Sequence, residues 1–241
     1  MQKKVGIIGA MAVEVKTLKT ELKPLPGKDK VESINAGNLE FTEGLLSSVP
    51  VVIVQSGVGK VNAALCAQRL ILQFGVSHII NTGIAGAAAS GLKVLDFVAS
   101  TDALYHDMDA SGFGYKITEI PQMACSDFMA DKKMIEAAEK TFNQLPQAKG
   151  HKLICGRIAS GDQFISSREK KEEIKKNCSP ACVEMEGAAI AHACHINNTP
   201  FVIIRCMSDM ADDSGETTYN FNEENAANLS AALVSGMIEK F

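Results

Sequence analysis

The chain has 241 residues, of which 46% are hydrophobic and 22% are charged, as in an ordinary globular protein. This length can bury a large core, and we expect a single domain over residues 1–241. The formal net charge of -4 and the lack of a basic stripe argue against a nucleic-acid partner, because nucleic-acid binders displace counterions with clustered Lys and Arg.

Short apolar runs alternate with amphipathic segments along the chain. Several of these runs are apolar on both faces, as the strands of a buried central sheet are. The predicted strands cover residues 5–9, 51–55, 78–82, 94–100, 153–159, 181–185 and 201–206. This alternation predicts a three-layer α/β fold with a largely parallel sheet.

Two segments carry the spacing of an amphipathic helix. Val15, Leu18 and Leu22 recur at i, i+3 and i+7, and a similar repeat joins Ala226 to Met237. Residues 102–130, in contrast, contain aromatic residues and a proline with little periodicity. We expect a long functional loop there.

The cysteines indicate the compartment. Seven cysteines are scattered along the chain without a CxxC pair, which does not suit a disulfide framework. We therefore expect a reducing compartment and a cytoplasmic protein. Residues 70–92 form the longest uncharged stretch, but Gln73, His78 and Asn81 interrupt it. We expect a helix end, a buried strand and a loop in this stretch, and no membrane partner.

Two glycine-rich turns, at residues 56–60 and 82–86, each follow a predicted strand. Backbone N–H groups can approach a ligand closely in such turns, although tight-turn geometry alone is the other explanation of these glycines. The first turn does not suit a nucleoside triphosphatase, because Val54 and Val61 replace the first glycine and the magnesium-binding hydroxyl of a Walker A loop. The opening strand also lacks the G-x-G-x-x-G spacing of a dinucleotide site.

Acidic residues stand at the ends of two predicted strands. Glu184 and Glu186 flank Met185 at the end of one strand, and Asp209 follows the other. Since the carboxyl ends of strands form the ligand crevice of open α/β sheets, we expect these carboxylates to converge there, for acid chemistry or the recognition of hydroxyls. The alternatives are an exposed strand edge for the two glutamates and a helix N-cap for Asp209.

A set of motifs, taken in order, resembles one family over essentially the whole chain. Each motif is weak alone, but together they are specific. The motifs are Ile7-Ile8-Gly9-Ala10-Met11 with Glu14, Ser56-Gly57-Val58-Gly59-Lys60-Val61, Asn81-Thr82-Gly83, Tyr105-His106-Asp107, Ser160-Gly161-Asp162-Gln163-Phe164-Ile165, Val183-Glu184-Met185-Glu186 and Ser208-Asp209. They resemble the 5'-methylthioadenosine/S-adenosylhomocysteine nucleosidases, which implies a nucleoside phosphorylase-like fold with a central mixed, largely parallel sheet.

The resemblance implies a hydrolase of the N-glycosidic bond of 5'-methylthioadenosine and S-adenosylhomocysteine, with 5'-deoxyadenosine as a further substrate. Adenine and the 5'-substituted ribose would be released, in methionine salvage and methyl-cycle detoxification. The resemblance also implies no cofactor and no metal. It implies a homodimer, in which the partner's loop covers the 5' substituent with Ala110, Phe113 and Pro121.

The resemblance assigns roles to three carboxylates. Asp209 matches the acid that protonates adenine at N7. An Asp with its usual pKa of about 3.9 is protonated in only about one molecule in a thousand at pH 7, so the site must raise this pKa. Glu14 matches the residue that orients and deprotonates the attacking water, and Glu186 matches the acceptor for the ribose hydroxyls. The other implied substrate contacts are Met11, Val58, Gly86, Phe164, Ile165, Met185, Arg205, Ser208 and Phe221.

Ordinary structural explanations exist for the same residues. Glu14, in an early helical turn, would complement the helix dipole, and Phe164 and Met185 would normally be core residues. The nearby cysteines and histidines have a spacing that fits no closed zinc site well, so we expect no metal. These residues are Cys178, Cys182, His192, Cys194 and His195.

A few positions depart from the family pattern. Ala12 and Val13 replace acidic residues that are common before the catalytic glutamate. Ile84 stands where many members have Ser near the attacking water. Ala110 is small for its position, which implies a wider pocket for the 5' group.

Three other functions share parts of this pattern. A nucleoside phosphorylase has the same fold but must bind phosphate, and the turns at residues 6–11 and 81–91 contain no arginine for it. A futalosine-type hydrolase matches the same motifs. A nonenzymatic nucleoside-binding or storage protein would keep the pocket, but it has little chemical need for both Glu14 and Asp209. Hydrolysis is therefore favoured.

Overall fold

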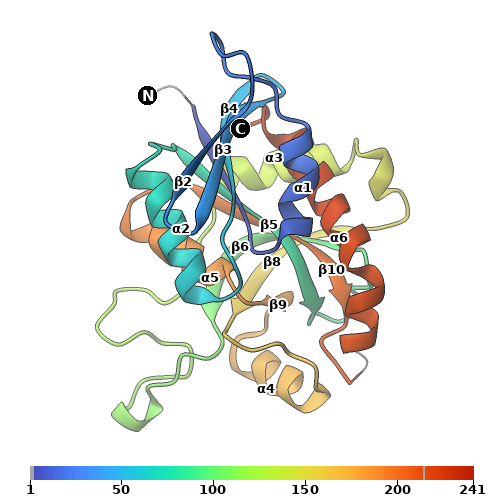
Figure 1. Ribbon diagram of the computed structural model, residues 1–241. Coiled ribbons are helices and arrows are strands. Elements are labelled where there is room, and N and C mark those ends of the chain that lie inside the picture. The colour runs from blue at the N-terminus through green and yellow to red at the C-terminus, as the bar shows by residue number, and fades with distance from the viewer. Residues whose placement is uncertain (1–2, 214) are drawn as a thin grey trace.

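The computed structural model describes residues 3–213 and 215–241, and at residues 215–217 it describes the backbone only. In this part of the chain ten strands form one mixed sheet with helices on both faces (Figure 1), which confirms the predicted three-layer α/β fold. The strands are β1 (Val5–Gly9), β2 (Glu32–Ala36), β3 (Leu39–Leu46), β4 (Val49–Gln55), β5 (His78–Ala87), β6 (Phe97–Tyr105), β7 (Phe128–Met129), β8 (Leu153–Ser160), β9 (Cys182–Glu184) and β10 (Phe201–Asp209). The α-helices are α1 (Ala12–Thr20), α2 (Lys60–Leu72), α3 (Lys132–Phe142), α4 (Arg168–Cys178), α5 (Gly187–Ile196) and α6 (Gly215–Met237), and the short 3-10 helices are η1 (Ser111–Phe113) and η2 (Pro146–Ala148).

The sheet has an open part and a closed part. In the open part β1 lies between β4 and β5 in parallel, and β3 and β2 continue antiparallel to the edge. In the closed part β5, β10, β6, β8 and β9 pair in a circuit, because β5 pairs with both β10 and β9. The register places Gly86 of β5 opposite both Asp209 of β10 and Val183 of β9. The circuit thereby brings polar residues at these strand ends to one place.

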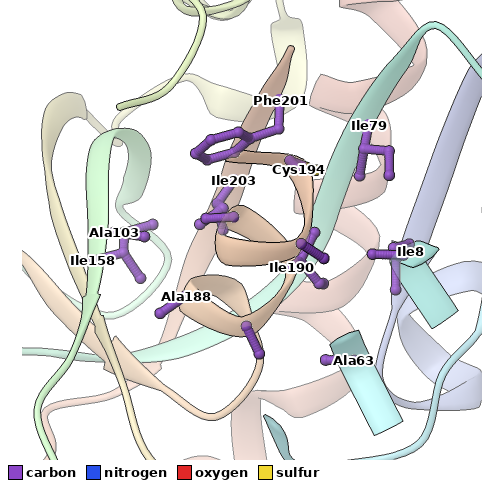
Figure 2. Packing of buried hydrophobic residues seen from close by; sticks show 14 of the residues in the cluster. Ile8, Ala63, Ile79, Ala103, Ile158, Ala188, Ile190, Cys194, Phe201 and Ile203 are labelled. Atoms are coloured by element: carbon purple, nitrogen blue, oxygen red, sulfur yellow. The ribbon is translucent and has the colours of Figure 1, made fainter. Parts of the chain in front are cut away.

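Each face of the sheet carries its own apolar core. On one face, Ile79 and Ile203 of the strands pack with Ala63 of α2 and with Ala188 and Ile190 of α5 (Figure 2). The small residues of α5 let this helix lie close to the sheet. Fully burying one such isoleucine contributes about 1.5 to 3 kcal/mol. The helices α1, α3 and α6 cover a second core on the opposite face.

Both predicted amphipathic helices are confirmed. Val15 and Leu18 are buried on α1, but this helix ends at Thr20, so Leu22 lies beyond it. The repeat that starts at Ala226 and ends at Met237 is buried on α6.

The sheet differs from the predicted strands in several places. β5 continues to Ala87, so the expected turn at residues 82–86 is wrong and these residues belong to the strand. β6 begins at Phe97, because Leu95 has a positive φ of 67° and belongs to a turn. The Asp96 side chain stabilises this turn by accepting hydrogen bonds from the N–H groups of Lys93 and Lys152. β2, at the edge of the sheet, and its neighbour β3 have no counterpart among the predicted strands, since their partly exposed sequences contain no apolar run.

The segment predicted to be a long loop is shorter than expected. β6 extends to Tyr105, and β7 forms near the other end, so the loop covers residues 106–127 and contains η1. In Figure 1 this green segment projects from the body of the protein at the lower left.

Three further observations concern the expected compartment and ligands. All seven cysteines lie within the described residues and are free. None of the described helices is long and apolar enough to cross a membrane. Residues 3–213 and 215–241, as far as they are described, hold no group of three or more His, Cys, Asp or Glu side chains placed to bind a metal ion.

Candidate active site

A cavity of about 420 Å³ lies at the end of the sheet where β5, β9 and β10 meet. Many of the predicted site residues line it: Glu14, Asp209, Met11, Val58, Gly86, Phe164, Met185, Glu186 and Ser208. The other lining residues are Ala10, Ile84, Ala85, Ser166, Val183, Glu184, Tyr219 and Asn220. The structure thus brings Glu14 and Asp209, which are far apart in the sequence, into one cavity.

Asp209, the last residue of β10, is buried at one end of the cavity. Its Oδ1 accepts a hydrogen bond from the N–H of Ala211 at 2.7 Å, and its Oδ2 lies 2.8 Å from Ser208 Oγ. Ser208 Oγ also lies 3.4 Å from the carbonyl oxygen of Ala85, so the hydroxyl can donate there and accept a hydrogen bond from a protonated Asp209. Burial raises the pKa of Asp209, while the Ala211 N–H and the Ser208 hydroxyl act in the opposite direction.

Gly86 is required beside Asp209. A Cβ at Gly86 would lie 2.8 Å from Asp209 Oδ1 and 2.8 Å from Ala211 Cβ, closer than real side chains approach. A glycine in β5 therefore makes the space in which the carboxyl group turns toward the cavity.

Glu14 lies in the first turn of α1 and is also buried. Its Oε2 accepts hydrogen bonds from the N–H groups of Ala10 at 2.6 Å and Met11 at 3.0 Å. Its Oε1 accepts one from the N–H of Ile84 at 3.0 Å. Both explanations of Glu14 thus apply, because the carboxylate complements the start of the helix and lines the cavity. Burial raises its pKa, against the effect of Arg205 and these three donors.

The side chain at residue 84 is not the polar group that the family pattern has there. Ile84 lines the cavity with its side chain, and its contact with Glu14 uses the backbone N–H. The preceding Gly83 is also constrained, since a Cβ there would overlap Glu14 Oε1 and Arg205 Nη1.

A second group of charges lies near Glu14. Glu186, between β9 and α5, accepts a hydrogen bond from the N–H of Gly59 at 2.8 Å. Arg205 is only 1% exposed and donates to Glu184 and to Asn81 Oδ1. Although it was an expected substrate contact, it is not among the lining residues. Burial, followed by the charge of Glu184, raises the pKa of Glu186 to about 7. The alternative of an exposed strand edge is wrong, because Glu184 and Glu186 are both buried.

Aromatic side chains form another wall of the cavity. Phe164 is half exposed, and its ring centroid lies 5.6 Å from that of Tyr219 in an edge-to-face arrangement. The hydroxyl of Tyr219 reaches to 3.4 Å from Met11 Sδ. Ile165 is buried and lines a small adjoining pocket of about 30 Å³.

The placement of Phe221 corrects the expectation that it lies beside the sugar. Phe221 is 88% exposed and is not among the lining residues, whereas Tyr219 and Asn220 are. The helix period explains the difference. Tyr219 lies seven residues before the buried Ala226 and so shares its face, while Phe221, five residues before Ala226, is turned away by about 140°.

Besides Arg205, Ile165 and Phe221, three more predicted residues do not line the cavity of their own chain. Ala110, Phe113 and Pro121 belong to the projecting loop, where Phe113 is 89% exposed. The structure therefore does not bring them to the cavity of the same chain.

Several lining residues are missing from the predicted set. Tyr219 is recognisable from the buried period of α6, as described above. Ser166 directly follows the predicted Phe164 and Ile165, and Glu184 stands within a quoted motif, so the position of each in the sequence was a usable signal. No comparable signal marks Asn220.

Comparisons with known proteins agree with this geometry. A family model described as the phosphorylase superfamily matches residues 4–239. The chain is 39% identical over 236 residues to a 5'-methylthioadenosine/S-adenosylhomocysteine nucleosidase of Staphylococcus haemolyticus, covering 98% of this chain and 99% of the relative.

Solved structures agree as well. The nucleosidase of Neisseria meningitidis in complex with methylthio-immucillin-A matches with a TM-score of 0.92 and 37% identity, over 99% of this chain and 100% of that chain. A futalosine hydrolase of Helicobacter pylori matches with a TM-score of 0.90 and 30% identity, over 99% of this chain and 98% of that chain. The chain therefore belongs to the phosphorylase superfamily and, within it, to the family of 5'-methylthioadenosine/S-adenosylhomocysteine nucleosidases.

Proposed function

We propose that the protein hydrolyses the N-glycosidic bond of 5'-methylthioadenosine and S-adenosylhomocysteine, and also that of 5'-deoxyadenosine, without a cofactor. Water adds to the anomeric carbon, and adenine and the 5'-substituted ribose leave. Such a reaction serves methionine salvage and the removal of the by-product of methyl transfer. The family membership and the two separated carboxylates Glu14 and Asp209 in one cavity support this proposal.

In the proposed mechanism Asp209 protonates adenine at N7, which makes the base a better leaving group. The raised pKa of this buried carboxyl supports that assignment, because the acid must carry a proton near neutral pH. Glu14 orients the water and takes its proton, while Glu186 accepts hydrogen bonds from the ribose hydroxyls. A weak nucleophile suffices, since the transition state is cation-like at the anomeric carbon. General acid catalysis contributes about 10² to 10⁴ in rate.

One observation favours water over phosphate as the nucleophile. The N–H groups of Ala10, Met11 and Ile84 converge in a manner suited to an anion, but the carboxylate of Glu14 already occupies them. Among the lining residues that the structure describes there is also no Lys or Arg. A phosphate ion would meet a carboxylate in place of a cation, so hydrolysis is favoured over phosphorolysis.

Product analysis tests this proposal. We would incubate the protein with 5'-methylthioadenosine, with and without phosphate, and identify the products. Adenine and free methylthioribose in both buffers are expected. A sugar 1-phosphate that forms only with phosphate would make the protein a phosphorylase. Release of no adenine in either buffer would overturn the proposal, and a parallel incubation with futalosine would test the hydrolase related to the Helicobacter pylori structure.

We also propose a homodimer in which the loop at residues 106–127 covers the 5' end of the partner's substrate. The exposure of Phe113 on this loop supports it. So does an apolar stripe on the outer face of α2, where Val61, Leu65 and Leu72 are 70%, 60% and 71% exposed. Light scattering after size-exclusion chromatography is expected to give twice the mass of the chain for the wild type. The variant Leu65→Glu is expected to give the mass of a single chain. A monomeric wild type would contradict the dimer.

The domain organisation and the cellular location are also part of the proposal. One domain over residues 1–241 is supported by the single sheet that joins the described strands. A cytoplasmic location is supported by the free thiols of all seven cysteines. Limited proteolysis and cell fractionation would test them.

A further inference from the structure

Glu184 is a buried carboxylate that the proposed mechanism does not use. It ends β9, and its polar contacts in the described chain are all with donors. Oε2 accepts hydrogen bonds from the N–H groups of Gly187 at 2.8 Å and Glu186 at 3.1 Å. Ser160 Oγ donates to Oε1, and it can do so because its own acceptor position receives the N–H of Ala188 at 2.7 Å. Glu184 and Ser160 together therefore hold the start of α5.

Glu184 also forms the closer of the two ion pairs of Arg205. One nitrogen of that guanidinium, Nη2, makes the ion pair with Glu184 and lies 2.6 Å from Asn81 Oδ1. The same nitrogen stays 3.8 Å from Glu186 Oε2. Glu186 thus has one close donor, the N–H of Gly59, whereas Glu184 has several.

We propose that Glu184 is a positioning residue, which fixes the backbone of Glu186 and keeps the guanidinium of Arg205 from a direct hydrogen bond with the Glu186 carboxyl. The Glu186 carboxyl is then left free for the ribose hydroxyls. This inference rests on the proposed function, because that function places the ribose beside Glu186.

The charge of Glu186 depends on pH because of the groups around it. The charged groups that face it are Glu184 of β9, Arg205 of β10 and Glu14 of α1, and the N–H of Gly59 approaches it at the start of α2. Burial and the two carboxylates outweigh Arg205 and the N–H, which gives Glu186 a pKa of about 7. Since the ionised form accepts hydrogen bonds from both ribose hydroxyls, we expect kcat/KM to rise with pH through about 7.

Glu184→Gln tests the proposal. The amide places an NH₂ group among donors, removes a charge beside Glu186 and frees Arg205 to approach Glu186. The acid limb of the pH profile of kcat/KM is expected to move down by about one unit or more. KM at pH 8 is expected to rise about tenfold with a smaller change in kcat. An acid limb at the wild-type pH would overturn the proposal.

Three further variants separate positioning from folding. Glu184→Asp keeps the charge, so its acid limb stays at the wild-type pH even where kcat/KM falls. Ser160→Ala removes one donor to Glu184 without a change of charge, so it raises KM and leaves the acid limb in place. Glu172→Gln, on the exposed face of α4, is the matched control and leaves both unchanged. A shift of the acid limb in Glu184→Asp equal to that in Glu184→Gln would contradict the charge argument.

A measurement without turnover distinguishes this proposal from the proposed function. The ¹³C resonance of the Glu186 carboxyl, assigned with Glu186→Gln, is expected to titrate near pH 7 in the wild type and at lower pH in Glu184→Gln. Absence of adenine release by the wild type would overturn the proposed function, but the titration of Glu186 could still be measured. A Glu186 resonance that titrates alike in the two proteins would overturn the inference, whatever the enzyme releases.

Discussion

The two ends of the cavity contain the same functional group in different surroundings. At the end where the base is proposed to bind, Asp209 contacts a hydroxyl and one N–H, and no Lys or Arg makes a hydrogen bond to it among the described contacts. At the end proposed for the sugar, three carboxylates surround the single guanidinium of Arg205. One end therefore favours a neutral acid, and the other holds its carboxylates with N–H donors and a cation.

This difference is consistent with the proposed acid role of Asp209 and base role of Glu14. Burial raises the pKa of Asp209 and of Glu14, yet Glu14 has three backbone donors and Arg205 to stabilise its ionised form. Pairs of titratable groups whose surroundings differ in this way assign the acid and the base. The variants below change one end at a time.

The largest effect is expected at the base end. Asp209→Asn keeps the shape of the side chain but removes the proton donor, so kcat is expected to fall by about 10² to 10⁴. Adenine release measures this, and the melting temperature is expected to change little. Asp213→Asn, an exposed acid nearby, is the control and keeps the wild-type kcat. A kcat for Asp209→Asn close to that of the wild type would rule out the acid assignment.

Two glycine substitutions give the next largest effect and separate the ends. The new Cβ in Gly83→Ala displaces Glu14 and Arg205, and misplacing catalytic groups by about 1 Å costs on the order of 10² in rate. Overpacking is also expected to lower the free energy of unfolding by about 1 to 3 kcal/mol. Gly86→Ala instead displaces Asp209, so only this variant should alter the basic limb of the pH profile. Identical profiles for the two variants would show that the ends are not independent.

A smaller effect concerns stability at the sugar end. Because the folded pKa of Glu186 is about 7, above its usual 4.5, the stability that its protonated form contributes is present at low pH and is lost as pH rises through about 7. Glu186→Gln imitates the protonated form and should avoid a loss of about 1 to 3 kcal/mol between pH 5 and 8. Urea unfolding at both pH values measures this. Equal pH dependence in wild type and variant would refute the raised pKa.

The smallest effect is expected at the aromatic wall. Tyr219→Ala removes a ring that packs beside Phe164 and is expected to raise KM about fivefold, since such contacts contribute on the order of 1 kcal/mol. Phe221→Ala is expected to leave KM at its wild-type value, because that ring is exposed. KM values for 5'-methylthioadenosine decide between the two positions, and a rise only in Phe221→Ala would reverse the assignment of this wall.

Local patterns were sufficient for much of the fold. Strands apolar on both faces, such as β1 and β4, are visible in the sequence because burial on two sides leaves little room for polar residues. β2 and β3 escaped prediction for the opposite reason, because both are partly exposed and mix polar or charged residues with apolar ones. The closed circuit also escaped it, since the pairing of β5 with β9 depends on residues far apart in the chain.

The candidate site was predictable where residues stand at strand ends. Glu186 and Asp209 follow apolar runs, and the structure places both in the cavity. The other contacts of the site depend on tertiary structure and could not be predicted from local sequence. The ion pair of Arg205 with Glu184 joins two strands that do not pair with each other directly in the described sheet, and no periodicity encodes it.

The closed circuit of strands divides the residues of the cavity into two groups, those held by the circuit and those outside it. Asp209 and the segment from Glu184 to Glu186 sit at the ends of strands whose neighbours are fixed on both sides, so a shift in one strand moves the others. Met11, Val58 and Tyr219, which also line the cavity, lie outside this circuit. We therefore expect substitutions at these three positions to reshape the cavity with less displacement of Asp209 and Glu186 than substitutions within the circuit.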